Sequence, residues 1–154
     1  MASPAPKDDR GFFMLPQGYE GGGYYVYGTP ERGAAQYAHP SMMSLILSVA
    51  GRWSYHDWRK FGVGNMSLAN GAVFDDHRGH RSGLEVDVRP VRKDGKKEKC
   101  IRGDTQYDFE ATKHLITLFI LSGRVKIIYF SDLNIPGVTY RGKHDNHFHV
   151  ELCI

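Results

Sequence analysis

Two short segments of this 154-residue chain carry side chains whose types and spacing could do chemistry together. The first, His80–Asp87, has an imidazole followed seven residues later by a carboxylate, and the second, His144–Glu151, has three imidazoles. We interpret both segments as strands, in which residues two apart share a face. The polar faces then carry Glu85, Asp87 and Arg89 on the earlier strand, and His147, His149 and Glu151 on the later one.

Two such strands lying near each other would assemble a metal site. A catalytic zinc takes three protein ligands from His, Asp, Glu or Cys and keeps a fourth position open, and His80, Asp87 and His149 would supply such a set. The metal makes water a stronger acid, and a further group must accept the proton or stabilise the developing charge. His147 shares a face with His149 and is placed for that role, whereas His144 would bind substrate or share the acid–base work.

Composition places the chain among ordinary globular proteins of one domain. Hydrophobic residues make up 41% and charged residues 24%, and the net charge of +3 is too small to predict a nucleic-acid partner. No apolar run approaches the roughly 20 residues that cross a bilayer, so we expect no transmembrane segment. We divide the chain into a flexible tail over residues 1–10 and a single domain over residues 11–154. Cys100 and Cys153 would either pair in an oxidising compartment or serve as two unrelated small apolar residues.

The remaining pattern predicts an α+β fold, with two main helices packed on a small antiparallel or mixed sheet. Apolar residues recur at helical spacing after Pro40 and again after Asp108. A β-branched run over residues 125–130 predicts a central strand, and residues 24–27 and 61–74 predict short ones. The charged segment 92–99 is interpreted either as a grip on an anionic substrate or as a solvated hairpin tip. We expect the metal site on the polar face of this sheet.

The two motifs also resemble a known superfamily. His80-x-x-Gly83-x-x-x-Asp87 followed by His147-x-His149 is similar to the motifs of the metallopeptidases that include lysostaphin-type enzymes, D-alanyl-D-alanine peptidases and the hedgehog signalling domain. The extended motifs most resemble those of the penicillin-insensitive murein endopeptidases. The resemblance rests on His77-x-x-His80, Gly83–Asp87 and His144-x-x-His147-Phe148-His149. The carboxypeptidase branch usually has a serine two residues before the first histidine, where this chain has Arg78.

The resemblance implies a role for each motif residue. His80, Asp87 and His149 would hold Zn²⁺, His147 would be an unliganded histidine that assists the transition state, and His144 would be a further site histidine. His77 would bind substrate or contact the metal ligands without binding the metal itself. The implied reaction is hydrolysis of an amide bond in peptidoglycan cross-links, typically between D-alanine and meso-diaminopimelate.

The chain start lacks the apolar core of a secretory signal peptide. We therefore expect delivery to the periplasm or cell wall by lysis, as for a phage enzyme, or by a secretion machine, as for an antibacterial effector with an immunity or delivery protein as partner. Two other functions remain open from the residues. A metal-dependent nuclease would use the same histidines on phosphodiesters, and a non-catalytic module would use the metal cradle to bind a wall fragment.

Overall fold

The computed structural model describes residues 6–18, 22–30, 32–74 and 79–154. These residues form an α+β fold, as predicted, with a five-stranded mixed sheet, a small two-stranded ribbon and two α-helices. The elements in chain order are β1 (Phe13–Met14), β2 (Tyr24–Val26), β3 (Tyr37–Ala38), α1 (Pro40–His56), β4 (Phe61–Val63), a 3-10 turn (Ala69–Gly71), β5 (Glu85–Val88), α2 (Phe109–Ile120), β6 (Val125–Tyr129) and β7 (Phe148–Leu152).

The strands of the main sheet lie in the order β2-β4-β5-β7-β6. Strands β2 and β4 are parallel, and every other neighbouring pair is antiparallel. The prediction of a central strand at residues 125–130 is wrong, because β6 is the last strand in this order. Its strand neighbour is β7, and its outer side has an isolated bridge between Tyr129 and Thr139. Its apolar run resembled a strand covered on both sides, yet Ile128 is its single fully buried residue because helices cover only one face of the sheet.

Both helices begin where the sequence predicts. Pro40 occupies the first turn of α1, where its missing N–H costs nothing, and the His39 ring accepts a hydrogen bond from the Ser41 N–H. Asp108 caps α2 by accepting a hydrogen bond from the Ala111 N–H. Each helix therefore starts at a side chain that satisfies its first free N–H groups.

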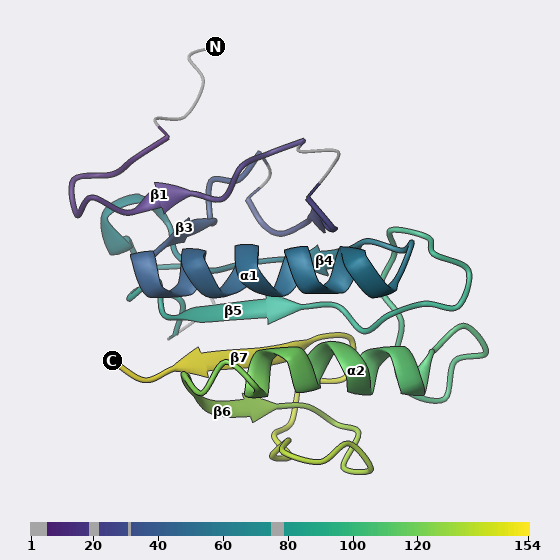
Figure 1. The fold of residues 1–154 in the computed structure, drawn as a ribbon. Helices are drawn as coiled ribbons and strands as arrows, with labels where there is room; N and C mark the ends of the chain where they lie inside the picture. The colour runs from purple at the N-terminus through teal and green to yellow at the C-terminus, as the bar shows by residue number, and fades with distance from the viewer. Residues whose placement is uncertain (1–5, 19–21, 31, 75–78) are drawn as a thin grey trace.

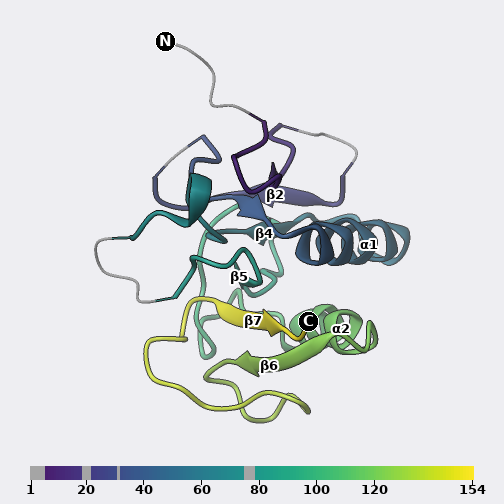
Figure 2. The same cartoon turned by 90° about the vertical axis from the view of Figure 1, so that its left-hand side faces the viewer.

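The hydrophobic core lies between the helices and one face of the sheet. In the two views at right angles, α1 and α2 lie side by side on the same side of the sheet, and long loops gather on the other side (Figures 1 and 2). Phe148, Val150 and Leu152 of β7 point into this core, as the alternation predicted, and so do Val86 and Val88 of β5. The opposite face of the same strands is left for the polar side chains.

Three further expectations can be compared with the structure. Within the predicted tail, residues 1–5 lie outside the described residues, whereas Asp8 and Arg10 contact the domain. Cys100 is buried and Cys153 is exposed, and both are free thiols. Among the described residues, no helix is long and apolar enough to span a membrane.

Candidate metal centre

Three side chains on the open face of the sheet converge within ligand distance of one point. His80 Nε2 lies 3.3 Å from one oxygen of Asp87, and His149 Nδ1 lies 2.9 Å from the other. One ligand atom from each of the three residues lies within 4.8 Å of the others. All three residues are buried, with 5 to 9% of their surface exposed. The fold thus brings together the three residues that the sequence proposed as metal ligands.

Strand register sets two of these positions. In the antiparallel pair of β5 and β7, Asp87 lies directly opposite His149, and Glu85 lies opposite Glu151. Directly opposed residues on one face have Cβ atoms roughly 4.5–5.5 Å apart, so their side chains meet without any loop rearrangement. A slip of one residue would turn His149 into the core and Val150 into the site.

His80 reaches the same point from a turn rather than from a strand. The predicted strand over residues 80–84 is wrong, since β5 starts at Glu85 and His80 has a left-handed backbone with φ of 58°. The turn needs Gly83, whose φ is 72° and whose missing Cβ would lie 2.6 Å from the backbone nitrogen of His39. The glycine of the first motif therefore has a packing reason.

The His80 side chain is held in one orientation. Its Nδ1 lies 3.1 Å from the Met66 carbonyl oxygen, which can only accept, so Nδ1 carries a proton, and Nε2 is the ring atom that faces Asp87, at 3.3 Å. Its backbone N–H donates to Glu85 at 2.5 Å. Both contacts leave Nε2 as the ring atom available to a metal.

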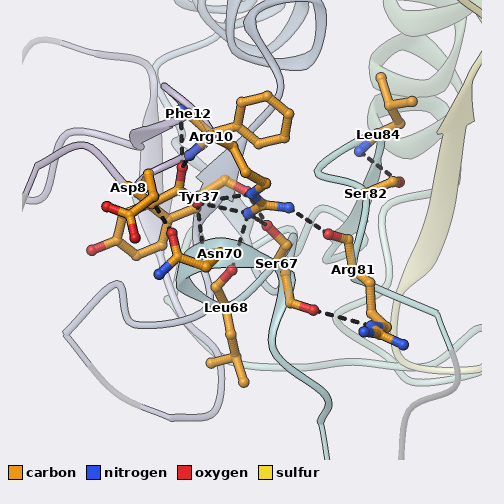
Figure 3. A network of polar contacts seen from close by, with 12 residues as sticks. Asp8, Arg10, Phe12, Tyr37, Ser67, Leu68, Asn70, Arg81, Ser82 and Leu84 are labelled. Atoms are coloured by element: carbon orange, nitrogen blue, oxygen red, sulfur yellow. Dashed lines mark hydrogen bonds and ion pairs between the residues drawn. The ribbon is translucent and has the colours of Figure 1, made fainter.

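A polar network behind this turn ties it to the N-terminal segment (Figure 3). The Arg10 guanidinium donates to the Arg81 carbonyl at 2.6 Å and to Ser67 Oγ at 2.8 Å. Asp8 pairs with the same guanidinium at 2.8 Å and accepts from the Asn70 N–H at 2.8 Å. Arg10 therefore braces the residue that follows His80 in the chain.

The His149 ring lies between carboxylates on both edges. Besides the Nδ1 contact with Asp87, its Nε2 lies 3.4 Å from Glu85 and 3.4 Å from Glu151. Burial opposes protonation of the ring, but the hydrogen bonds to Asp87 and Glu85 outweigh it and raise the pKa of His149 to about 9. In the metal-free protein the ring is thus protonated at neutral pH, and a metal would displace the Nδ1 proton while Nε2 stays held.

The carboxyl group of Asp87 is kept ionised. Its burial favours the neutral acid, yet hydrogen bonds from His149 and His80 hold its pKa well below the ordinary value. The pKa of Glu85 is also lowered, first by its hydrogen bond with His149 and then by the His80 N–H, against the opposing effect of burial. Two anionic carboxylates therefore face the two imidazoles at neutral pH.

The other two histidines of the second motif line the same site. His147 Nε2 lies 3.7 Å from Asp87, and its Nδ1 lies 2.8 Å from the amide oxygen of Asn146, to which it must donate. His144 Nδ1 donates to the Gly142 carbonyl at 2.9 Å, and its ring centre lies 5.1 Å from that of His147. Burial, as the largest effect, lowers the pKa of both rings. Both are thus neutral bases at neutral pH.

The donor set fits zinc. Two imidazoles and one carboxylate suit this metal better than magnesium or calcium, which prefer oxygen ligands alone. Tetrahedral zinc with ligands at about 2.0–2.1 Å separates neighbouring ligand atoms by roughly 3.3 Å. One ligand atom from each of the three residues lies within 4.8 Å of the others, so a shift of the side chains would bring all three to one ion.

A cavity of about 770 Å³ opens over this group, lined by residues from the sheet and from the loop before β7. It contains the metal-ligand candidates together with His144 and His147, and it extends past Tyr27 and Arg89 toward β2. The predicted site residue His77 lies outside the described residues. Sequence reasoning left Glu151 unassigned and gave Glu85 no role, because the carboxylate contacts of His149 Nε2 depend on strand register.

Comparison with known proteins adds one result. The sequence profile of the family described as penicillin-insensitive murein endopeptidase matches residues 14–116, more than half of the chain. The matched range includes His80 and Asp87 and ends before the three histidines around β7, which the fold itself brings to the site. None of the curated proteins matches the chain.

Proposed function

The chain belongs to the penicillin-insensitive murein endopeptidase family, and we propose that it is a zinc-dependent hydrolase of the amide bond between D-alanine and meso-diaminopimelate in peptidoglycan cross-links. Family membership supports peptidoglycan as the substrate and cross-link cleavage as the activity. The convergence of His80, Asp87 and His149 in one cavity is the observation that supports metal dependence.

The proposed chemistry divides between the ligands and the free histidines. Zinc held by His80, Asp87 and His149 would act as a Lewis acid on the amide carbonyl and make water more acidic. His147 has a neutral ring whose Nε2 faces the ligand group, so it accepts the proton from the attacking water. The proton then passes to the leaving nitrogen. His144, whose ring centre lies 5.1 Å from that of His147, shares this transfer through Nε2 or accepts a hydrogen bond from the substrate there, because its Nδ1–H donates to the Gly142 carbonyl.

Mass spectrometry of digested peptidoglycan tests the proposal. The zinc-loaded protein should convert cross-linked dimers into monomers with a free diaminopimelate amine, and a chelator should stop the reaction until zinc is restored. His80→Ala and His149→Ala should each abolish cleavage, whereas His56→Ala, on the exposed end of α1, serves as the matched control. Cleavage that persists in the His149→Ala protein would exclude this mechanism, and degradation of plasmid DNA under the same conditions would favour the nuclease alternative.

We further propose that the protein reaches the wall as a phage lysis enzyme or as an antibacterial effector with an immunity or delivery partner. A chain of 154 residues with a net charge of +3 is compatible with both routes. Expression in a Gram-negative host with and without an added secretion signal tests whether access to the periplasm is required: lysis should follow only the secreted form. Equal lysis by both forms would contradict a wall target.

A further inference from the structure

The open face of the sheet continues from the metal group onto β2 and β4, where two aromatic rings and a guanidinium form a platform. Tyr25 lies in β2, Tyr27 directly follows that strand, and Arg89 directly follows β5. The Arg89 guanidinium carbon lies 3.9 Å from the centre of the Tyr27 ring, a close cation–π contact. Arg89 is two residues from Asp87, so both side chains project from the same face of the strand.

Two glycines make the platform possible, Gly62 in β4 and Gly64 directly after it. Tyr25 pairs with Gly62 in the parallel register of β2 and β4. A Cβ on Gly62 would lie 2.7 Å from the Tyr25 ring, and one on Gly64 would lie 2.6 Å from the Tyr27 ring. The two rings therefore pack directly against the glycine backbone. The Arg89 guanidinium in turn packs on the Tyr27 ring.

The described residues around Arg89 carry positive charge without a matching carboxylate. Those that line a cavity of about 270 Å³ beside the platform include Tyr25, Tyr27, Lys60, Arg89 and Lys97, and none of the described lining residues is acidic. Within the described part of the chain, no carboxylate lies within 4.0 Å of these three cations, whereas nearby Arg59 and Arg92 each pair with aspartate. Among the described residues, the Arg89 guanidinium donates to the Lys97 carbonyl at 3.3 Å and to the Tyr25 hydroxyl, which leaves part of its five N–H donors for a ligand.

This cavity lies next to the one over the metal group. Tyr27 and Arg89 line both, so Arg89 is within reach of a ligand that lies over the metal group. Two residues along a strand span roughly 7 Å, a distance that the Arg89 side chain and one residue of substrate can bridge. The carbon next to the cross-link nitrogen of diaminopimelate carries a free carboxylate, and the D-glutamate of the stem peptide carries another.

We propose that Arg89, stacked on Tyr27 and flanked by Lys60 and Lys97, binds a free carboxylate of the stem peptide while the cross-link amide lies at the metal group. The inference rests on the proposed function, whose substrate it specifies. A planar guanidinium held flat by an aromatic ring presents its fork edge for two parallel hydrogen bonds to a carboxylate. Amidated peptidoglycan, which lacks that charge, is then a poor ligand.

Binding of three uncross-linked muropeptides to the zinc-loaded full chain tests this, since such products cannot be cut again. One has both carboxylates free, one has the diaminopimelate carboxylate amidated, and one has the D-glutamate carboxylate amidated. Calorimetry should show that one amidation weakens binding about 10- to 100-fold, the range expected for a charge-assisted pair. The ligand that loses affinity identifies which carboxylate Arg89 binds.

Variants separate the subsite from general damage. Arg89→Gln should bind all three muropeptides with the affinity of the weakest, and Arg89→Lys should show an intermediate loss because it keeps charge without the fork. Arg52→Gln, an exposed arginine on α1, should match the wild type. Zinc content and thermal midpoint of each variant confirm that the fold is kept.

Three results would overturn the inference: affinities within twofold across the three ligands, discrimination that survives in Arg89→Gln, or no binding of any muropeptide. Failure of the proposed function appears separately, as intact cross-links after incubation of the zinc-loaded protein with peptidoglycan. The two failures are therefore read from different measurements.

Discussion

Replacing Glu85 by glutamine should weaken zinc binding about tenfold without unfolding the protein. The Glu85 carboxylate accepts from the His80 backbone N–H at 2.5 Å and lies 3.4 Å from His149 Nε2, so it orients two of the three candidate ligands. Glutamine has nearly the same shape and keeps an acceptor oxygen, but it loses the charge that strengthens both contacts. The variant therefore isolates the orienting effect of the carboxylate.

The expected magnitude follows from the two contacts. A hydrogen bond to a charged acceptor contributes about 1 kcal/mol more than one to a neutral acceptor, and the longer contact to His149 contributes about half of that. Together they amount to about 1.5 kcal/mol, or roughly tenfold in the dissociation constant of zinc. Losses of about 10- to 100-fold are usual for carboxylates that support metal-bound histidines.

Competition with a chromophoric chelator at pH 7.5 measures this dissociation constant. Glu151→Gln removes a single contact of 3.4 Å to the same ring and should weaken zinc binding only about twofold. Glu110→Gln, on the exposed first turn of α2, is the matched control. A Glu85→Gln protein that binds zinc within twofold of the wild type, with an unchanged melting midpoint, would refute the reasoning, and so would a larger loss in Glu151→Gln.

Three further predictions concern catalysis, pH and stability. His147→Ala should lower the rate of cross-link hydrolysis about 10²- to 10⁴-fold and leave the zinc content unchanged. The muropeptide assay measures the rate and metal analysis the zinc content. Loss of zinc would instead show that His147 is a ligand. The metal-free protein should lose stability as the pH rises from 6.5 to about 9, because the raised pKa of His149 contributes up to about 3 kcal/mol that is fully present below 6.5. It should also lose stability below about pH 4, because the lowered pKa of Asp87 contributes only while that carboxyl is ionised. Urea unfolding at intervals of one pH unit measures the alkaline and the acid loss of stability. A free energy of unfolding that does not change with pH would contradict both. Phe148→Ala should lower the free energy of unfolding by about 3–5 kcal/mol, because the fully buried ring contacts Phe119 and Phe130. Urea unfolding measures this loss. A loss under about 1 kcal/mol would show that the core is not packed as described.

Local patterns in the sequence were sufficient for the helices and for the polar faces of the two motif strands. Pro40 and Asp108 mark helix starts because their effects act within a few residues, on free N–H groups of the first turn. The alternation in Phe148–Leu152 predicted which side chains enter the core, because side-chain direction along a strand depends only on its backbone. The same reasoning failed at residues 125–130, because an apolar run does not say whether a strand has neighbours on both sides.

The identities of the three candidate ligands were readable from residue types and spacing, but their meeting was not. Asp87 faces His149 because β5 and β7 pair in one particular register, and that register depends on the packing of Val86 and Val150 into a shared core. His80 joins them from a left-handed turn that no strand pattern contains. The contacts of Glu85 with both histidines, and the platform that supports Arg89, arise between segments far apart in the chain. Sequence therefore determined which groups are present, and tertiary structure alone decided which atoms face one another, because register and turn geometry are set by contacts that residue spacing does not encode.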